Sequence, residues 1–537
     1  MIDVASHRPG RAEFLSALVV TLVAVGFHLV FLFSAGGLWR DESGGVALAT
    51  LPHLSEVWHE LTHDSFPGLF VLLVRGWVAL VGPGDFALRC LGLLVGLGWL
   101  GAVWANARWL GLRTPWVCLA LLALNLTMIQ WGDSLRAYGL GSVWVVLFFG
   151  RMWAFLRQPQ PRNFILAALL AVLLVQTLYQ SAFLVAAICL AGALVLARRS
   201  RWSLAGASLA VGAPAALSLL PYLRPLRESQ SWWIVEKTGF NAPFTWHTLS
   251  TALDTPMFLG PWLWIGLLGA GMIYGMTWLE KRISRRADIS EDLPFFGACS
   301  AGGGLIAFFV FVVSAGLPTQ PWYWLILLSF FAVCLEATVG FWLRKKLPRL
   351  LWLVLGIVAL SLVSTLPRAG QRMTNMPEVA AKISAAARPQ DLILVYPWYL
   401  GVSFDRYYQS NTPWATVPDI ADHRFHRYDQ LKEKLQEADA LRTLYERIDA
   451  TLQQGGSIWL VGGLPQPEPG EKEAPSLPPA PESPTGWYDE PYNHMWGRQL
   501  DLRLRQKTRK VEPVLIPDSK RATRYEAIPV YKMSSAL

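Results

Sequence analysis

The hydrophobic residues of this chain are gathered in long runs before residue 367 and become sparse after it. A helix needs about 20 apolar residues to cross the hydrocarbon core of a bilayer, because lipid offers no partner for free backbone groups. Most of the runs approach that length and therefore predict membrane helices. The predicted segments are 13–35, 67–82, 86–106, 115–132, 138–156, 163–178, 181–197, 203–221, 259–279, 295–316, 321–342 and 349–366.

Basic residues between the runs indicate how the chain is oriented, since Lys and Arg are enriched in cytoplasmic loops. If all three basic clusters are cytoplasmic, the loop 222–258 and everything after about residue 366 lie outside the cytoplasm. The clusters are Arg198, Arg199 and Arg201; Lys281, Arg282, Arg285 and Arg286; and Arg344, Lys345, Lys346 and Arg349.

The number of predicted spans conflicts with the basic residues near the N-terminus. Arg8 and Arg11 should be cytoplasmic, which places the loop 36–66 outside only if one of the next two apolar runs does not cross. Segment 67–82 is the shortest and contains Arg75. We therefore expect it to be re-entrant or interfacial, which leaves eleven true spans.

The tail after residue 367 has the alternating pattern of a small α/β domain. Two short apolar runs, 391–396 and 457–461, predict buried strands, and further strands are expected near 514–516 and 525–531. The stretches 377–387 and 429–454 predict amphipathic helices, and the Pro-rich stretch 465–484 predicts a mobile loop. The sequence thus predicts a polytopic helical membrane domain, 1–367, with external loops 36–66 and 222–258, followed by an extracytoplasmic α/β domain, 368–537.

Composition supports this organisation. The chain is 53% hydrophobic and only 16% charged, whereas soluble proteins carry about 25% charged residues. Its net charge of +9 resides largely in short loops, and no basic surface interleaved with aromatic residues indicates nucleic-acid binding. The five cysteines all lie within apolar runs and predict neither a disulfide nor a zinc site. Many of the 26 tryptophans lie near run ends, as an interfacial belt would, including Trp39, Trp116, Trp262, Trp322 and Trp342.

The first external loop carries the adjacent carboxylates Asp41 and Glu42. Two carboxylates at a membrane surface are costly unless they are solvated, paired or used. One interpretation is that Asp41 or Ser43 caps a short helix beginning near Gly45. The other is that a carboxylate acts as a general base on an acceptor hydroxyl.

Two further polar groups mark the same predicted side of the membrane. Arg136 and Tyr138 lie at the start of a predicted span, and a guanidinium can bind a phosphate in bidentate fashion or simply anchor a helix at the interface. His63 and Asp64 end the first external loop before Pro67, either as a helix-entry signal or as part of a site.

Together these features resemble the membrane-embedded C-type glycosyltransferases that use polyprenyl-phosphate sugars, such as dolichyl-phosphate-mannose protein mannosyltransferases and bacterial lipid A aminoarabinose transferases. Asp41 and Glu42 match the family's acidic pair. His63 is kept from a His-Pro-Pro-like motif, with Asp64-Ser65-Phe66-Pro67 in place of the proline pair. The segment 134–140, Ser-Leu-Arg-Ala-Tyr-Gly-Leu, loosely matches a family element of the form Ser-Arg-x-x-x-Pro-Tyr-Ala-Leu. These departures leave the sugar and the acceptor open.

The resemblance implies an inverting transfer from a polyprenyl-phosphate sugar to a lipid, glycan or protein hydroxyl, in a bacterial inner membrane. It implies that Asp41 is the general base and that Arg136 stabilises the departing phosphate. Glu42 would orient Asp41 or hold a divalent cation; members of the group differ in their use of a metal, so none is assigned.

The loop 222–258 offers further contacts. Arg224, Arg227 and Lys237 are candidates for the lipid phosphate, and Trp232, with Trp233 beside it, for stacking on a sugar. An interfacial amphipathic loop with belt aromatics explains the same residues equally well.

A competing motif, His59-Glu60-Leu61-Thr62-His63, fits the zinc-protease pattern HExxH, in which a helix presents two imidazoles on one face. Only His53 and Asp64 lie near as a third ligand, and His63 also fits the glycosyltransferase pattern. A zinc metalloprotease is therefore one alternative function.

A transporter is a third class, since many spans would suit one. Transporters tend to have internal repeats and broken or charged helices at the mid-membrane. Here the predicted spans are nearly free of charge, which favours chemistry at the membrane surface.

Overall fold

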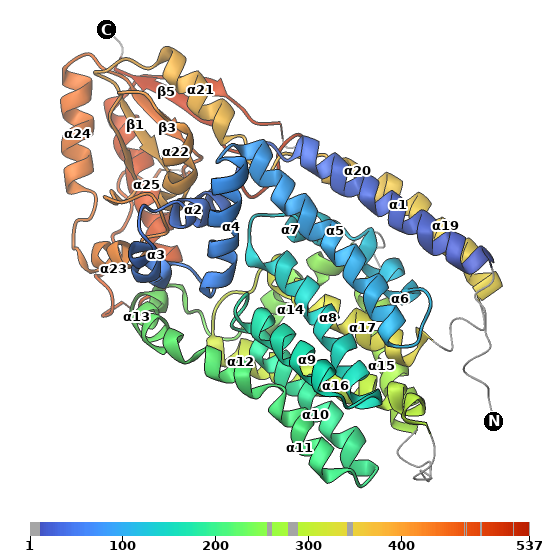
Figure 1. Cartoon of the computed structure of the whole chain (residues 1–537). Coiled ribbons are helices and arrows are strands. Elements are labelled where there is room, and N and C mark those ends of the chain that lie inside the picture. The colour runs from blue at the N-terminus through green and yellow to red at the C-terminus, as the bar shows by residue number, and fades with distance from the viewer. Residues whose placement is uncertain are drawn as a thin grey trace.

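The computed structural model describes residues 11–535 apart from 255–259, 278–287, 341–346, 467, 469, 484–485 and 519. A helical bundle is followed by an α/β domain at one of its ends (Figure 1). The bundle comprises α1 (Arg11–Ser34), α2 (Arg40–Ala49), α3 (Leu54–Glu60), α4 (Gly68–Val81), α5 (Asp85–Trp109), α6 (Trp116–Cys118), α7 (Leu126–Gly132), α8 (Ala137–Arg157), α9 (Pro161–Val175), α10 (Ser181–Arg198), α11 (Trp202–Ala210), α12 (Ala213–Ser218), α13 (Leu223–Trp233), α14 (Ala242–Leu253), α15 (Gly260–Met276), α16 (Leu293–Ala315), α17 (Leu325–Thr338), α19 (Leu347–Ser364) and α20 (Leu366–Ala369).

Seven helical stretches of the described chain are long and apolar enough to cross a membrane. Two of them, around α8 and α17, form the centre of the bundle, since 78% and 94% of their apolar windows are buried within the protein. The others expose one face, as helices in contact with lipid do. The polytopic helical membrane architecture predicted from the sequence is therefore present. The seven stretches are Glu13–Ser34, Asp85–Trp109, Ala137–Arg157, Ser181–Arg198, Trp202–Glu236, Ile289–Ala315 and Pro321–Thr338.

The predicted segment 115–132 is not one helix, contrary to expectation. The chain forms a wide five-residue turn over Leu119–Ala123 and then restarts as α7, where the Asn125 side chain accepts a hydrogen bond from the Met128 N–H at 3.0 Å. An Asn at this position satisfies a backbone donor that a helix start leaves free, which explains the break.

The short helix α4 enters and leaves on the side of the C-terminal domain. Near its start, the Gly68 N–H donates to the Tyr222 hydroxyl at 3.2 Å, and just after its end Asp85 accepts from Arg406 of the C-terminal domain at 2.8 Å. Arg75 in its middle donates to the carbonyls of Ala49 and Leu51. Fourteen residues of helix span about 21 Å, less than the hydrocarbon core. The re-entrant or interfacial path of segment 67–82 stays a prediction, to which this short helix conforms.

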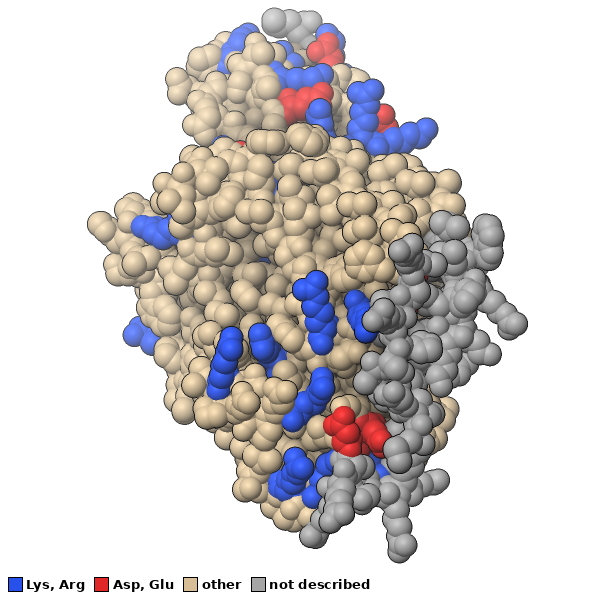
Figure 2. Space-filling model, turned by 45° about the vertical axis from the view of Figure 1, so that its right-hand side comes forward, with Lys and Arg blue, Asp and Glu red and all other residues tan. Residues whose placement is uncertain are grey.

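The charge distribution follows the same axis. Figure 2 shows a largely uncharged region next to the C-terminal domain, with most of the other basic side chains in the opposite half of the molecule. The turn between α10 and α11, which carries Arg198, Arg199 and Arg201, lies in that opposite half (Figure 1). The basic residues 281–286 and 344–346 lie outside the described residues. The assignment of the C-terminal domain to the non-cytoplasmic side stays a prediction from the positive-inside rule.

The tryptophans at run ends do not all form a belt. Trp39, Trp131 and Trp322 are buried, with ring centroids 5.1 Å apart for Trp39 and Trp131 and 4.3 Å for Trp131 and Trp322. Tyr525 of the C-terminal domain packs on all three. The interfacial interpretation is therefore wrong for Trp39 and Trp322, which join the two domains, whereas Trp262 is 65% exposed.

The C-terminal domain holds a five-stranded mixed sheet of order β2-β1-β3-β5-β4. Strands β2, β1 and β3 are parallel, and β5 is antiparallel to both β3 and β4. The elements are α21 (Met376–Ala386), β1 (Leu392–Val395), α22 (Gly401–Tyr407), β2 (Trp414–Thr416), α23 (Tyr428–Gln436), α24 (Arg442–Gln453), β3 (Ile458–Val461), α25 (Glu490–Lys507), β4 (Lys510–Leu515) and β5 (Val530–Ser534).

Alternation along β1 explains why helices cover both faces of this sheet. Leu392 and Leu394 pack with the apolar residues of α23, α24 and α25, whereas Ile393 and Val395 pack with those of α21 and α22. Successive strand residues point to opposite faces, so an uninterrupted apolar strand needs two covers. The predicted α/β domain is therefore present.

Several details of this domain differ from expectation. Strand β2 and helices α22 and α25 were not predicted, and the helix expected over 429–454 is interrupted between α23 and α24. The strand expected at 525–531 begins only at Val530. The stretch 465–484 contains no helix or strand in its described part, although Ala480 is buried and its N–H donates to the Leu435 carbonyl.

Candidate functional site

A polar cavity of about 280 Å³ lies where the membrane bundle meets the C-terminal domain. Its walls come from α2, the turn after α3, the start of α8, the segment before α17 and a loop of the C-terminal domain. Asp41, Asp64, His63, Arg136 and Tyr138, all sequence candidates, line it together. The structure thus places Asp41 and Arg136 in one cavity.

Asp41 lies in the first turn of α2. The expected helix start near Gly45 is wrong, because α2 begins at Arg40. The Asp41 side chain is 23% exposed, and its Oδ1 lies 3.7 Å from Arg40 Nε and 3.9 Å from His426 Nε2. Neither contact is a hydrogen bond. The carboxylate therefore faces the cavity with its oxygens available.

Glu42 points the other way and is fully buried. Its carboxylate accepts from Arg89 at 2.5 and 2.8 Å and from the Leu135 N–H at 2.9 Å. It also accepts from the Trp39 N–H at 3.2 Å, which closes the start of α2. Glu42 therefore fixes Asp41's helix against the segment that leads to Arg136, and it is not among the residues that line the cavity.

Arg136 is held by several groups at once. Its guanidinium donates to the Asp64 carboxylate at 3.1 and 3.5 Å and to the Asp41 main-chain carbonyl at 3.2 Å, and it lies over the Phe66 ring at 4.3 Å. Its Nε is buried and has no hydrogen-bond partner among the described residues. Asp64 thus positions Arg136, and the Nε of Arg136 can still donate to an anion.

The HExxH residues do not form the helix face of a zinc protease. Helix α3 ends at Glu60, and His63 follows in a separate 3-10 turn, η1 (Leu61–His63). His59 is exposed, whereas the His63 ring stacks between Trp232 and Phe425, with centroid distances of 5.1 and 6.3 Å. Among the described residues no three His, Cys, Asp or Glu side chains are grouped to hold a metal. The candidate set Glu42, His59 and His63 therefore does not fit a metal ion.

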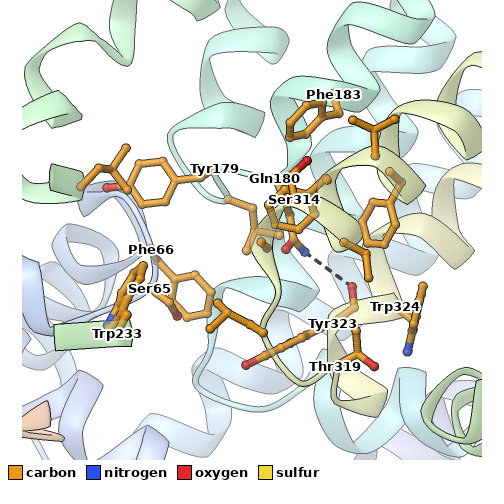
Figure 3. Close-up of a pocket in the computed structure, with 18 of the residues that line it drawn as sticks. Ser65, Phe66, Tyr179, Gln180, Phe183, Trp233, Ser314, Thr319, Tyr323 and Trp324 are labelled. Atoms are coloured by element: carbon orange, nitrogen blue, oxygen red, sulfur yellow. Dashed lines mark hydrogen bonds between the residues drawn. The ribbon is translucent and has the colours of Figure 1, made fainter. Parts of the chain in front are cut away.

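An apolar cavity of about 500 Å³ adjoins the polar one (Figure 3). Aromatic and aliphatic side chains of α16 and of the turns around Tyr179, Trp233 and Tyr323 form its walls, and Gln180 Nε2 donates to the Tyr323 carbonyl at 3.5 Å. Among the described residues that line it, Lys237 is the one cation. Both cavities are lined by Ser65, Tyr138, Trp233, Leu317 and Tyr323.

The other candidates from the loop 222–258 lie elsewhere. The Arg224 side chain is 82% exposed and paired with Glu228, and Arg227 is exposed too; neither lines the two cavities. Trp232 stacks on His63, and its neighbour Trp233 lines both cavities.

Sequence reasoning missed the contribution of the C-terminal domain. Tyr399, Phe425, His426 and Tyr428 line the polar cavity opposite Asp41. Burial lowers the pKa of His426 to about 4, so its imidazole is neutral at pH 7. The stretch 422–429, Asp-His-Arg-Phe-His-Arg-Tyr-Asp, was a possible signal, because it concentrates charged, His and aromatic residues between two apolar elements.

No protein-family model matches the sequence, and no curated protein matches it. Among solved structures, the chain is similar to ArnT from Cupriavidus metallidurans bound to undecaprenyl phosphate, at 14% identity and a TM-score of 0.49 over 97% of this chain and 98% of that one.

The chain is also similar to the Archaeoglobus fulgidus oligosaccharyltransferase tethered with an acceptor peptide, at 12% identity and a TM-score of 0.49 over 83% of this chain and 69% of that one. The same organism's AglB, in complex with an inhibitory peptide and a dolichol-phosphate, is similar at 10% identity and a TM-score of 0.47, over 84% and 70% of the two chains. At these identities and TM-scores the similarity carries no argument about function or mechanism.

Proposed function

We propose that this chain is a membrane glycosyltransferase that moves a sugar from a polyprenyl-phosphate donor to an acceptor hydroxyl. The observation that carries the proposal is the pair of adjoining cavities. One is apolar and built from bundle helices, the other is polar and presents an unbonded carboxylate, and both share one wall. A donor with a long apolar chain and a polar head suits such a pair.

In this arrangement the prenyl chain occupies the apolar cavity and the sugar lies at the shared wall, near Tyr138 and Trp233. Lys237 and the free Nε of Arg136 then flank the phosphate. Charge-assisted bonds to an anion in a site that excludes water stabilise negative charge strongly. Arg224 and Arg227 have no part in this arrangement.

Asp41 is the general base. Its carboxylate takes the proton of the acceptor hydroxyl as that oxygen attacks the anomeric carbon. The bond from that carbon to the phosphate oxygen breaks, the lipid phosphate leaves with the electron pair, and the configuration inverts. Glu42 positions α2 through Arg89, Asp64 positions Arg136, and no step passes through a metal ion.

The test is transfer by the full-length protein in proteoliposomes, with a panel of undecaprenyl-phosphate hexoses and pentoses as donors. General-base catalysis contributes about 10²–10⁴-fold, so Asp41→Asn should lower the rate by that factor. Asp254→Asn is the matched control, because Asp254 pairs with Arg368 and lines neither cavity. Full activity of Asp41→Asn would refute the assignment.

The alternative functions make different predictions. A metalloprotease would lose activity with Glu60→Gln and bind zinc stoichiometrically. A transporter would move solute into sealed vesicles and tolerate both substitutions.

A further inference from the structure

The acceptor side of the polar cavity is built by two parts of the chain that are far apart in sequence. Asp41 faces it from α2, and Tyr399, Phe425, His426 and Tyr428 face it from the C-terminal domain. Backbone atoms of Arg424 and Phe425 pack directly over Gly44 of α2. The C-terminal domain therefore forms a wall of the site.

The charges that line this cavity disfavour an anionic acceptor. The described lining contains four carboxyl groups, on Asp41, Glu60, Asp64 and Glu236, and two guanidiniums, on Arg40 and Arg136, so acidic groups outnumber basic ones. Like charges brought together in a partly desolvated site cost free energy.

The two guanidiniums are also already engaged. Arg40 lies 3.7 Å from the carboxylates of both Asp41 and Glu526 and stacks over the Tyr399 ring at 4.6 Å. Arg136 is paired with Asp64, and we have assigned its Nε to the phosphate of the sugar donor. An acceptor phosphate or carboxylate would have no cation of its own.

Aromatic rings and hydrogen-bond acceptors make up the rest of the lining. Tyr399, Phe425 and Tyr428 present rings from one side, and Trp233 and Trp322 from the other. The Tyr428 hydroxyl donates to Glu236 at 2.5 Å, which holds that ring in place. The C–H face of a pyranose packs on such rings, and its hydroxyls donate to carboxylates, which accept only.

His426 adds a neutral polar group beside the base. Its imidazole makes no hydrogen bond to another described side chain and lies 3.9 Å from Asp41. Because the ring is neutral, one nitrogen donates and the other accepts, so it can bind a sugar hydroxyl in either sense.

Resting on the proposed glycosyl transfer, we propose that the acceptor is an uncharged carbohydrate. His426 and Tyr428 are then residues that determine acceptor specificity. A cavity of about 280 Å³ is near the lower limit of small-molecule sites, about 300–1,000 Å³, so it accommodates the end of a glycan.

The experiment uses the full-length protein in proteoliposomes, the donor found active in the panel above, and three kinds of acceptor. These are methyl hexopyranosides, the same glycosides carrying a 6-phosphate, and a short uncharged peptide that contains Ser and Thr. We expect transfer to at least one neutral glycoside, with kcat/KM at least about tenfold lower for its phosphate, which corresponds to about 1.4 kcal/mol.

His426→Gln and Tyr428→Phe should each raise the KM for the glycoside about tenfold. His423→Gln and Tyr445→Phe are matched controls, since these residues are of the same types and line neither cavity. A second measurement does not need turnover. Saturation-transfer NMR detects binding of the methyl glycosides to the Asp41→Asn protein.

Equal use of phosphorylated glycosides, transfer to the peptide alone, or an unchanged KM in both variants would overturn the acceptor proposal. Consumption of donor without transfer to any glycoside would also overturn it, while the proposed function would stand. If no lipid-phosphate sugar is consumed, both fail.

Discussion

The two adjacent carboxylates of the first loop, Asp41 and Glu42, lie in different surroundings. Asp41 faces the polar cavity with its oxygens unbonded, whereas Glu42 is fully buried and bonded to Arg89. On one turn of helix, successive side chains point about 100° apart, so neighbours in sequence enter different surroundings. An acidic pair that looks uniform in sequence therefore contains one carboxylate that faces the cavity, which we propose as the base, and one structural carboxylate.

We predict that Glu42→Gln destabilises the protein far more than the loss of a surface ion pair. Removing one partner of a buried pair leaves the other charge uncompensated and costs about 3–5 kcal/mol. The midpoint of thermal denaturation in detergent measures the effect.

Glu228→Gln is the control for this comparison, because its partner Arg224 is exposed and such pairs contribute about 0–1 kcal/mol. Equal midpoints for the two variants would show that the buried pair contributes no more than the exposed one.

At the scale of elements, the start of α2 is clamped by the C-terminal domain. Glu526 accepts from the Arg40 N–H at 2.8 Å, and its other carboxylate oxygen is buried without a described partner. Burial raises the pKa of Glu526 to about 7, against the attraction of Arg40. The Glu526 carboxyl, which holds the start of the helix that carries Asp41, therefore titrates near neutral pH.

Because the folded pKa of Glu526 is raised, its contribution to stability is fully present below about pH 4.5 and is lost as the pH rises through about 7. A pKa change of one pH unit corresponds to about 1.36 kcal/mol, so the contribution of Glu526 to the free energy of unfolding falls by roughly 3 kcal/mol between low and high pH. Glu526→Gln should remove this dependence, so the variant gains stability over the wild type between pH 5 and pH 8.

Thermal midpoints at those pH values measure the gain. His426, whose pKa is lowered, acts below pH 6.5 in the opposite sense and is present in both proteins, so it cancels in the difference. Parallel pH profiles for the two proteins would contradict the role given to Glu526.

The junction of α7 and α8 depends on glycine. A Cβ at Gly139 would collide with the Gly132 carbonyl, and one at Gly92 of α5 with the Asp133 carbonyl. These close approaches fix the short segment that carries Arg136. Larger side chains there would shift Arg136 relative to Asp41.

We therefore predict that Gly139→Ala destabilises the fold by about 1–3 kcal/mol, as overpacking does, and lowers transfer activity. Gly101→Ala is the matched control, because nothing lies within 4 Å of a Cβ at Gly101 in the same bundle. Thermal midpoint and initial rate are the measurements, and two equally tolerated variants would argue against close packing at the junction.

For the whole molecule, the path of α4 decides the topology. Both ends of α4 contact groups on the side of the C-terminal domain, so it should not cross the membrane. We predict that single cysteines at Pro83 and Gln409, introduced after the five native cysteines are removed, react with an impermeant reagent from the same side.

A cysteine at Arg113, in the loop after α5, should react only from the other side. Labelling of the Pro83 and Gln409 positions from opposite sides would show that α4 crosses. Labelling of the Gln409 position from the cytoplasm would reverse the predicted orientation.

The membrane architecture, the α/β tail and the choice of Asp41 and Arg136 as candidates could all be predicted from the sequence. Hydrophobicity is a property of each residue that adds up over a window of about 20, so membrane helices are readable locally. The wide turn before α7 and the burial of Trp39 and Trp322 could not be predicted locally, because they depend on which residues pack against them.

Three findings required the three-dimensional structure: Glu42 is paired with Arg89, Trp233 rather than Trp232 lines the cavities, and His426 and Tyr428 line the polar cavity. These contacts join segments that are far apart in the sequence, and no motif in either segment indicates the other as its partner. The free energy of burying a side chain is set by its neighbours in space, and a single sequence does not contain those neighbours as a pattern.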